Sequence, residues 1–252
     1  PPQVGDYDGP ADQGGDLQGR VDPAAGNLLV NGDFEAFDSG EPLRLDNTGQ
    51  DWRESRRDTD AGMRLLMLST KDIAGNATKK AMIKGHPELN TYLTQRFPDQ
   101  KARFTASWEI CVREILPDDN RSAFAFVGTS SDRKNGPNST GTERFVFLGF
   151  ENSTTAPGKI NLFAREDRNA WSDRTIVAAD LDLMTWHRVR VEIDAAGRKY
   201  TVQVNDLPAT GPLKAFRTSS KKAPRTLDQI SFASWNDGAG TFYVDNVSVQ
   251  AP

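Results

Sequence analysis

Hydrophobic and polar residues alternate in short runs along most of this chain, and these runs predict strands. Between Arg188 and Ile193, charged residues alternate with valine and isoleucine, which predicts a strand with one wet face and one buried face. The run from Phe145 to Phe150 is apolar on both faces, which is typical of a central strand covered on each side. The clearest predicted strands cover residues 102–112, 122–128, 143–150, 159–165, 187–194, 199–205, 229–233 and 240–249.

Glycine, proline, asparagine and aspartate separate these runs, as expected for strands joined by turns. Asp194 and Gly197 bracket a tight connection, so the strands on either side of it are expected to form a hairpin. The best candidate for a helix is the short stretch from Pro87 to Gln95. Many short strands with little helix favour an all-β fold, namely a two-sheet antiparallel β-sandwich, or jelly roll, with minor helix.

The first 26 residues differ in texture from the rest of the chain. They are rich in glycine, proline, aspartate and glutamine and lack apolar periodicity, so we expect an extended N-terminal arm or linker over residues 1–26. Strand-like runs begin at Asn27, and residues 27–252 are predicted to form one jelly-roll domain. All-β sandwiches often hold roughly 200–250 residues in a single unit, which this length fits.

Composition narrows the classes of function. Thirteen Phe and five Trp supply enough large apolar side chains for a folded core. The formal net charge is −4 and no basic stripe is present, so nucleic acid is not an expected partner. The single cysteine, Cys111, cannot form a disulfide within the chain, and two histidines are too few for a metal site built on several of them.

Two segments far apart in the sequence resemble parts of known carbohydrate-binding proteins. Residues 27–35 (NLLVNGDFE) and 242–249 (FYVDNVSV) resemble the opening and closing strands of jelly-roll carbohydrate-binding modules of families 4, 9 and 22. Residues 186–191 (WHRVRV) and 200–205 (YTVQVN) resemble the core hairpin of concanavalin-A-like lectin/glucanase and laminin-G-like domains. The resemblance implies a jelly-roll sandwich in which the first and last strands pair, and a protein concerned with carbohydrate.

The resemblance also bears on location and on metal binding. No run approaches the ~20 apolar residues of a membrane helix, and the chain starts with Pro-Pro, which fits removal of an export signal; a secreted or cell-surface protein without a membrane span is expected. In the jelly-roll modules a structural calcium often lies where the first and last strands meet, and the matching side chains are Glu35 and Asp245. Calcium needs about six to eight oxygens, so the alternative is that both carboxylates are only solvated or hydrogen-bonded.

Aromatic residues in polar surroundings are the candidates for sugar binding, because sugars stack on aromatic rings while polar groups take their hydroxyls. Trp171 and Trp235 have such surroundings, with Arg165, Asn236 and Asp237 as polar neighbours. The leading hypothesis is a domain that binds a polysaccharide or oligosaccharide through these residues. The alternative for each tryptophan is that it caps a loop against the edge of the sandwich.

An enzyme of this fold is the second hypothesis. A glycoside hydrolase needs two carboxylates facing one cleft, and the nearest pair, Glu166 and Asp167, is adjacent in sequence, so on a strand the two point to opposite faces. A polysaccharide lyase needs a base, an acid and a cation for the uronate, and His86, Tyr92 and Arg96 could supply them, although the lyase signature Tyr-x-Lys-x-Gly-x-Tyr is absent. A structural or adhesive domain of a larger surface protein is the third hypothesis. The specific glycan and the oligomeric state stay open.

Overall fold

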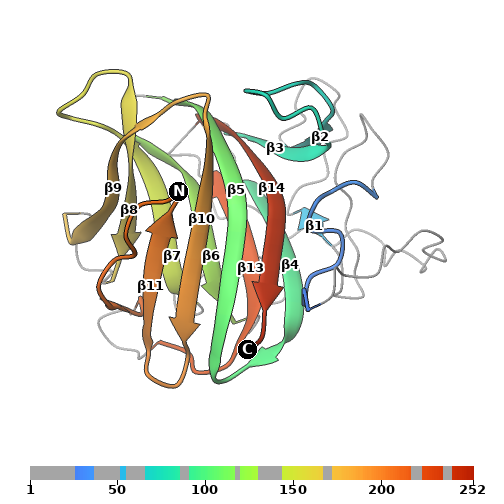
Figure 1. The fold of residues 1–252 in the computed structure, drawn as a ribbon, viewed down its shortest axis with the longest axis vertical. Helices are drawn as coiled ribbons and strands as arrows, with labels where there is room; N and C mark the ends of the chain where they lie inside the picture. The colour runs from blue at the N-terminus through green and yellow to red at the C-terminus, as the bar shows by residue number, and fades with distance from the viewer. Residues whose placement is uncertain are drawn as a thin grey trace, which may run out of the picture.

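In the part of the chain that the structure describes, fourteen strands form two stacked antiparallel sheets (Figure 1). The computed structural model describes residues 26–36, 52–54, 66–85, 91–116, 120–129, 144–166, 172–216, 223–234 and 240–252. Sheet A has the order β12 (Leu213–Lys214), β11 (Lys199–Val204), β10 (Trp186–Asp194), β5 (Arg103–Ile115), β14 (Gly240–Gln250), β3 (Lys80–Lys84) and β2 (Leu66–Ser69). Sheet B has the order β1 (Arg53–Glu54), β4 (Thr91–Gln100), β13 (Leu227–Ser234), β6 (Arg121–Gly128), β7 (Arg144–Asn152), β8 (Lys159–Arg165) and β9 (Arg174–Asp182).

The predicted all-β sandwich is confirmed, and each of the eight predicted strands is found, with shifts of a few residues at its ends. The predicted helix over Pro87–Gln95 is wrong for its last five residues, which belong to β4. Leu93 turns into the core there, and β4 exchanges backbone hydrogen bonds with β13, so a tertiary partner outweighs a weak helical pattern. No helix, and therefore none able to cross a membrane, occurs among the residues described.

The core lies between the sheets and is held by aromatic contacts across the two layers. Trp108 of β5 meets Phe232 of β13 edge to face, with ring centroids 5.7 Å apart and an interplanar angle of 74°. Phe145 of β7 and Tyr200 of β11 make a second contact between the layers, at 6.5 Å. All four side chains are buried, and burial of each stabilises the fold by about 1.5–3 kcal/mol or more.

The beginning and the end of the domain pair with each other, as the resemblance implies. The backbone N–H of Leu28 donates to the carbonyl of Val249 at 2.7 Å, and Asn27 bridges to Gln250. A bulge after Asp245 then lets Val247 donate to the carbonyl of Gly32 at 2.8 Å. A Cβ atom at position 32 would lie 2.0 Å from the Val247 carbonyl oxygen, so only glycine allows this approach.

The predicted hairpin between β10 and β11 is also found. The two strands pair from Asp194 with Lys199 up to Val189 with Val204, and the Asp194 carboxylate accepts the Gly197 N–H at 2.8 Å. His187 of β10 is 3% exposed, and its two ring nitrogens contact the Asp182 carbonyl oxygen at 2.8 Å and the Asn205 amide at 3.2 Å. Both ring nitrogens therefore serve structural contacts.

Candidate functional site

One face of sheet B turns away from the core, and four strands, β4, β6, β7 and β8, place cationic and aromatic side chains on it. Along β13, Ile230 and Phe232 point into the core, so Gln229, Ser231 and Ala233 lie on the opposite face, which we call the outer face of sheet B. Cross-strand register extends this face to both sides of β13. The residues that β4 places there include Tyr92, paired with Ala233.

Five phenylalanine rings form the floor of this face. They are Phe124, Phe126, Phe147, Phe163 and Phe216, all fully buried in a cluster separate from the main core. The backbone of β7 comes close to this floor at Gly149, where a Cβ atom would lie 2.7 Å from each of two rings. Phe216 reaches the cluster from the segment after β12, and its N–H donates to the Phe145 carbonyl at 2.8 Å. The floor therefore combines strands of sheet B with the segment that follows β12 of sheet A.

Two arginines stack on the floor. The guanidinium of Arg144 (β7) lies 4.9 Å from the Phe126 ring centroid and 5.1 Å from that of Phe147. The guanidinium of Arg165 (β8) lies 5.5 Å from Phe147 and 5.8 Å from Phe216. Both arginines are buried, and the ring faces attract their positive charge. The outer face thus holds two fixed cations that share two aromatic rings, Phe147 and Phe216.

A third arginine lies on the same face at the β4 side. Arg96 is paired with Gln229 across the strands, and its guanidinium donates to the Asp228 carboxylate at 3.1 Å, with 38% of its side chain exposed. Gln229 is only 2% exposed, yet its side-chain oxygen has no hydrogen-bond partner within the described structure. A buried acceptor without a donor destabilises a protein by about 1–3 kcal/mol, and the Gln229 oxygen can accept one further hydrogen bond.

The structure brings together residues that the sequence analysis assigned to different hypotheses. Tyr92 and Arg96, proposed for a lyase, lie on the outer face of sheet B, as does Arg165, proposed for sugar binding. The other candidates, His86, Trp171, Trp235, Asn236 and Asp237, lie outside the described residues.

Sequence reasoning missed two residues of this face, Arg144 and Gln229. A bulge shifts the register of β6 and β7, which sends Phe145 into the core and leaves Arg144 on the outer face opposite Gly128. Simple alternation does not reveal such a bulge. The sequence could have placed Gln229 on the outer face, because Gln229 directly precedes the core residue Ile230 in a predicted strand.

The predicted metal ligands Glu35 and Asp245 both contact the segment of residues 76–79. The Asp245 carboxylate is 1% exposed and accepts hydrogen bonds from the Asn76 amide at 2.8 Å and the Thr78 hydroxyl at 3.1 Å. Burial raises its pKa, while these donors act in the opposite direction. The Glu35 carboxylate accepts the backbone N–H of Lys79 at 2.7 Å.

A buried lysine lies beside these carboxylates. Lys80 has no exposed surface, and its ammonium donates to the carbonyl of Lys71 at 2.8 Å and to that of Thr78. Burial lowers the Lys80 pKa, whereas the charges of Asp245, Asp72 and Glu35 raise it. No group of three His, Cys, Asp or Glu side chains in the described part of the chain is arranged to hold a metal.

These contacts do not suit a calcium ion at this junction. Calcium needs lone pairs, but the Asp245 oxygens already face hydrogen-bond donors, and two nearby carbonyls accept from the Lys80 ammonium. The positive charge that the carboxylates require is present within the chain itself. Calcium binding therefore stays a prediction without support from the described contacts.

Comparison with known proteins identifies the fold. No protein-family model and no curated protein matches the chain. Among solved structures, it is similar to a conserved carbohydrate esterase from Shiga toxin-encoding bacteriophage phi24B, with a TM-score of 0.55, 13% identity, and coverage of 89% of this chain and 98% of the esterase. It is also similar to the catalytic domain of a glycoside hydrolase family 131 protein from Coprinopsis cinerea, with a TM-score of 0.52, 13% identity, and coverage of 90% and 94%.

A third similar structure is the Emp47p carbohydrate recognition domain, with a TM-score of 0.50, 14% identity, and coverage of 94% of this chain and 99% of that domain. A protein described as a sialidase is matched over 75% of this chain but 17% of its own length, with 12% identity and a TM-score of 0.45. The chain has the concanavalin-A-like jelly-roll fold that its sequence resembles.

Proposed function

We propose that this chain is a carbohydrate-binding domain that holds a polysaccharide or oligosaccharide against the outer face of sheet B. Tyr92 provides a half-buried aromatic ring at the β4 side of this face, and Arg96 provides a partly exposed cation four residues along the same strand. Beside these two residues, the neighbouring strand β13 contributes the Ser231 hydroxyl and the Gln229 side-chain amide. This combination of ring, cation and uncharged polar groups is the one that sugars require.

The observation that carries the proposal is the buried side-chain oxygen of Gln229, which has no donor among the described residues. It lies opposite Arg96, at the more open part of the face. A sugar hydroxyl is a donor of the right kind for this oxygen, and the arginine beside it suits an acidic sugar. Three of the similar structures, each with a TM-score of 0.50 or above, have names that refer to carbohydrates or glycosides, which supports a sugar ligand. A polysaccharide ligand also fits a secreted or cell-surface location.

A polysaccharide lyase is the second candidate function. The observation that favours it is the presence of Tyr92, Arg96 and Gln229 on one face, because a lyase needs a proton-transferring group beside groups that neutralise a uronate. We rank it below binding because the predicted partner His86 lies outside the described residues.

Three variants test the proposal by affinity electrophoresis in gels that contain a polyuronate, a neutral glucan or no polymer. Gln229→Leu removes the unpartnered oxygen, so we expect binding to weaken about two- to tenfold, the value of one hydrogen bond, while stability is maintained or rises. Tyr92→Leu removes a ring and is expected to weaken binding as well. Lys84→Gln, at an exposed lysine of sheet A, is the matched control and should leave binding unchanged.

The same samples separate the candidate functions. Release of an unsaturated product, followed by ultraviolet absorbance, would replace the binding proposal with the lyase. Equal binding by wild type and Gln229→Leu would remove Gln229 from the site. Retardation by none of a broad panel of glycans would overturn the carbohydrate proposal and favour the adhesive hypothesis, which a protein partner would then support.

A further inference from the structure

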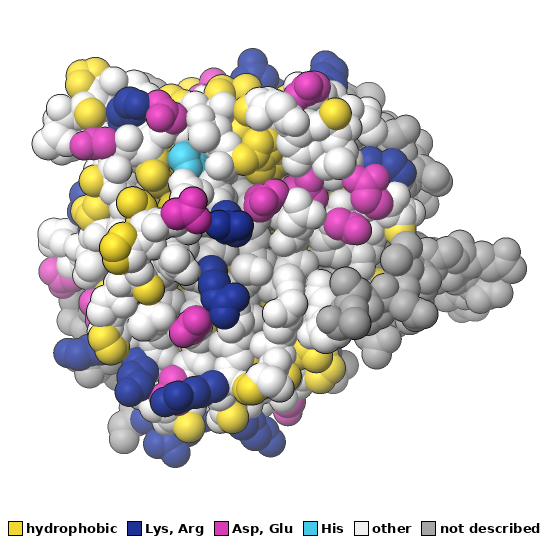
Figure 2. Space-filling model, in the orientation of Figure 1, with side chains coloured by type: hydrophobic (Ala, Val, Ile, Leu, Met, Phe, Trp, Pro, Cys, Tyr) yellow, Lys and Arg dark blue, Asp and Glu magenta, His cyan; other side chains and the backbone are white. Residues whose placement is uncertain are grey.

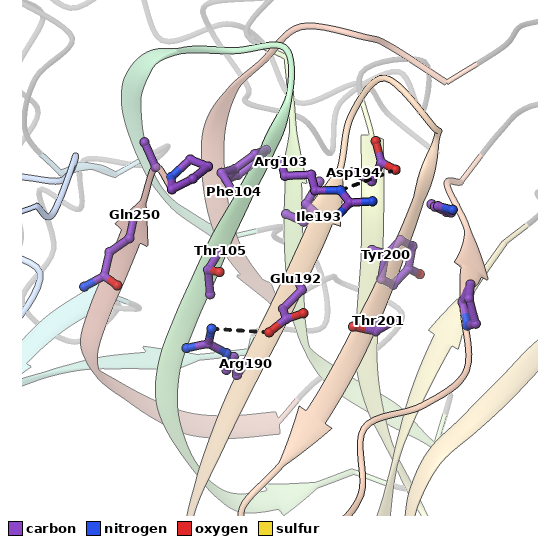
Figure 3. A pocket seen from close by; sticks show the side chains of 14 residues that line it. Arg103, Phe104, Thr105, Arg190, Glu192, Ile193, Asp194, Tyr200, Thr201 and Gln250 are labelled. Carbon is purple, nitrogen blue, oxygen red and sulfur yellow. Dashed lines mark hydrogen bonds and ion pairs between the residues drawn. The ribbon is translucent and has the colours of Figure 1, made fainter.

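A groove crosses the outer face of sheet A, on the opposite side of the sandwich from the candidate site. Its volume is about 450 Å³, and Figure 3 shows the side chains that line it. Cross-strand register places Gln250, Thr105, Glu192 and Thr201 in one row over four neighbouring strands. With strands ~4.8 Å apart, this row is roughly 14 Å long, which suits an extended ligand better than a single small molecule.

Basic side chains outnumber acidic ones among the residues that line the groove. Arg103, Arg190 and Lys199 line it together with two carboxylates, those of Glu192 and Asp194. Arg190 and Glu192 form an ion pair at 3.3 Å, marked by a dashed line in Figure 3, and Arg103 lies 4.0 Å from Asp194. Lys199 makes no ion pair with any described residue. Figure 2 shows dark blue side chains gathered at the lower end of this face, although the chain as a whole has a net charge of −4.

Two lysines face each other at the edge of this basic region. Lys199 of β11 is directly opposite Lys214 of β12, and both side chains are exposed. Their neighbours Tyr200 and Leu213 point into the core, so both lysines project from the outer face. Like charges directly opposite one another destabilise a pair of strands. An anion bound between them would relieve this repulsion.

We propose that the groove and the Lys199–Lys214 pair form a second binding surface, which takes an acidic polysaccharide. The lysines and Arg103 would neutralise carboxylate or sulfate groups along the polymer, and the row of threonine and glutamine side chains would hydrogen-bond its hydroxyls. The surface is made of sheet A residues and their chain neighbours Pro212, Ala251 and Pro252, and it does not include the proposed site on sheet B.

The test compares single lysine variants for binding to polygalacturonate and chondroitin sulfate, with neutral dextran as the uncharged polymer. We expect Lys199→Gln and Lys214→Gln each to weaken binding about two- to fivefold, the range of an exposed ion pair, and the double variant to weaken it further. Binding should also fall as salt is raised. The control Lys84→Gln removes an exposed lysine from the same sheet outside the groove and should bind like wild type.

Thermal unfolding of the same variants separates a binding role from a structural one. Removal of either lysine relieves the repulsion, so the unfolding temperature should hold or rise while binding falls. Equal affinity of wild type and the double variant for the acidic polymers would overturn the proposal. So would equal binding of polyglutamate or single-stranded RNA, because the surface would then recognise any polyanion.

The two proposed surfaces can fail independently. If Gln229→Leu weakens binding and the lysine double variant does not, the glycan site on sheet B stands and the surface on sheet A is rejected. If only the lysine double variant weakens binding, the surface on sheet A stands and the glycan site on sheet B is rejected.

Discussion

Replacement of Lys80 by methionine would show whether a buried ammonium stabilises the junction where the sequence resemblance implies a structural calcium ion. Methionine has almost the same length as lysine but no charge and no hydrogen-bond donor. In Lys80→Met, the carbonyls of Lys71 and Thr78 lose the donor that they share, and Asp245 loses a nearby positive charge. The wild-type contacts of Asp245 with Asn76 and Thr78 are retained.

The expected loss of stability is about 2–3 kcal/mol. Hydrogen bonds to a charged group contribute about 1.5–3 kcal/mol each, so two of them set an upper value near 6 kcal/mol. The enclosed ammonium, whose pKa burial lowers, is itself unfavourable to bury, and its removal offsets roughly half of that loss. For a domain of this size, about 2–3 kcal/mol corresponds to a fall of roughly 4–12 °C in the unfolding temperature.

Urea unfolding, followed by intrinsic fluorescence, measures the change, with Lys84→Met as the control on the same strand. Lys84 is exposed, so its replacement should change stability by less than about 0.5 kcal/mol. Both proteins and the wild type are measured with added calcium and with EDTA. If Lys80→Met matches the wild type within that margin, or if EDTA destabilises the wild type, the reasoning is refuted, and the second outcome would restore the calcium prediction.

Two further perturbations address the fold. Gly32→Ala should destabilise the protein by about 1–3 kcal/mol in thermal or urea unfolding, because its Cβ would overlap the Val247 carbonyl. Gly211→Ala is the control, because a Cβ atom there meets no atom within 4 Å. Equal effects of the two substitutions would contradict the close approach at Gly32. Cys111 is buried, and burial raises its thiol pKa to about 11, so a thiol reagent at pH 8 should label it only as the protein unfolds; rapid labelling of the native protein would argue against this burial.

The sequence predicts elements well where one face of a strand is wet and the other is buried. In β10, alternation of charged and aliphatic residues fixes both the strand and its faces. In β4, the stretch from Thr91 to Gln95 has no such contrast, because most of its residues are buried on one face or the other. Its identity as a strand depends on pairing with β13, which a local pattern does not contain.

The candidate site was predictable in part, for a similar reason. Tyr92, Arg96 and Arg165 could be chosen by residue type, but their placement on one face follows from the strand order β4-β13-β6-β7-β8, which only the assembled sheet provides. Lys80 follows another lysine, Lys79, in a polar stretch, and such a residue is usually exposed. Its burial arises because residues 71–78 fold back over it and offer carbonyl oxygens.

The short segment from Leu213 to Phe216 connects the two sheets. Its first residues pair with β11 in sheet A, Ala215 donates to the carbonyl of Arg198, and Phe216 donates to that of Phe145 in sheet B. The ring of Phe216 lies 5.2 Å from that of Phe147, beneath both stacked arginines. Lys214 and Phe216 are two residues apart, so separation of β12 from β11 would also displace Phe216 from the aromatic floor of sheet B. Exchange of the Phe216 amide hydrogen with solvent therefore reports on the outer faces of both sheets, and it should slow when a ligand binds to either face.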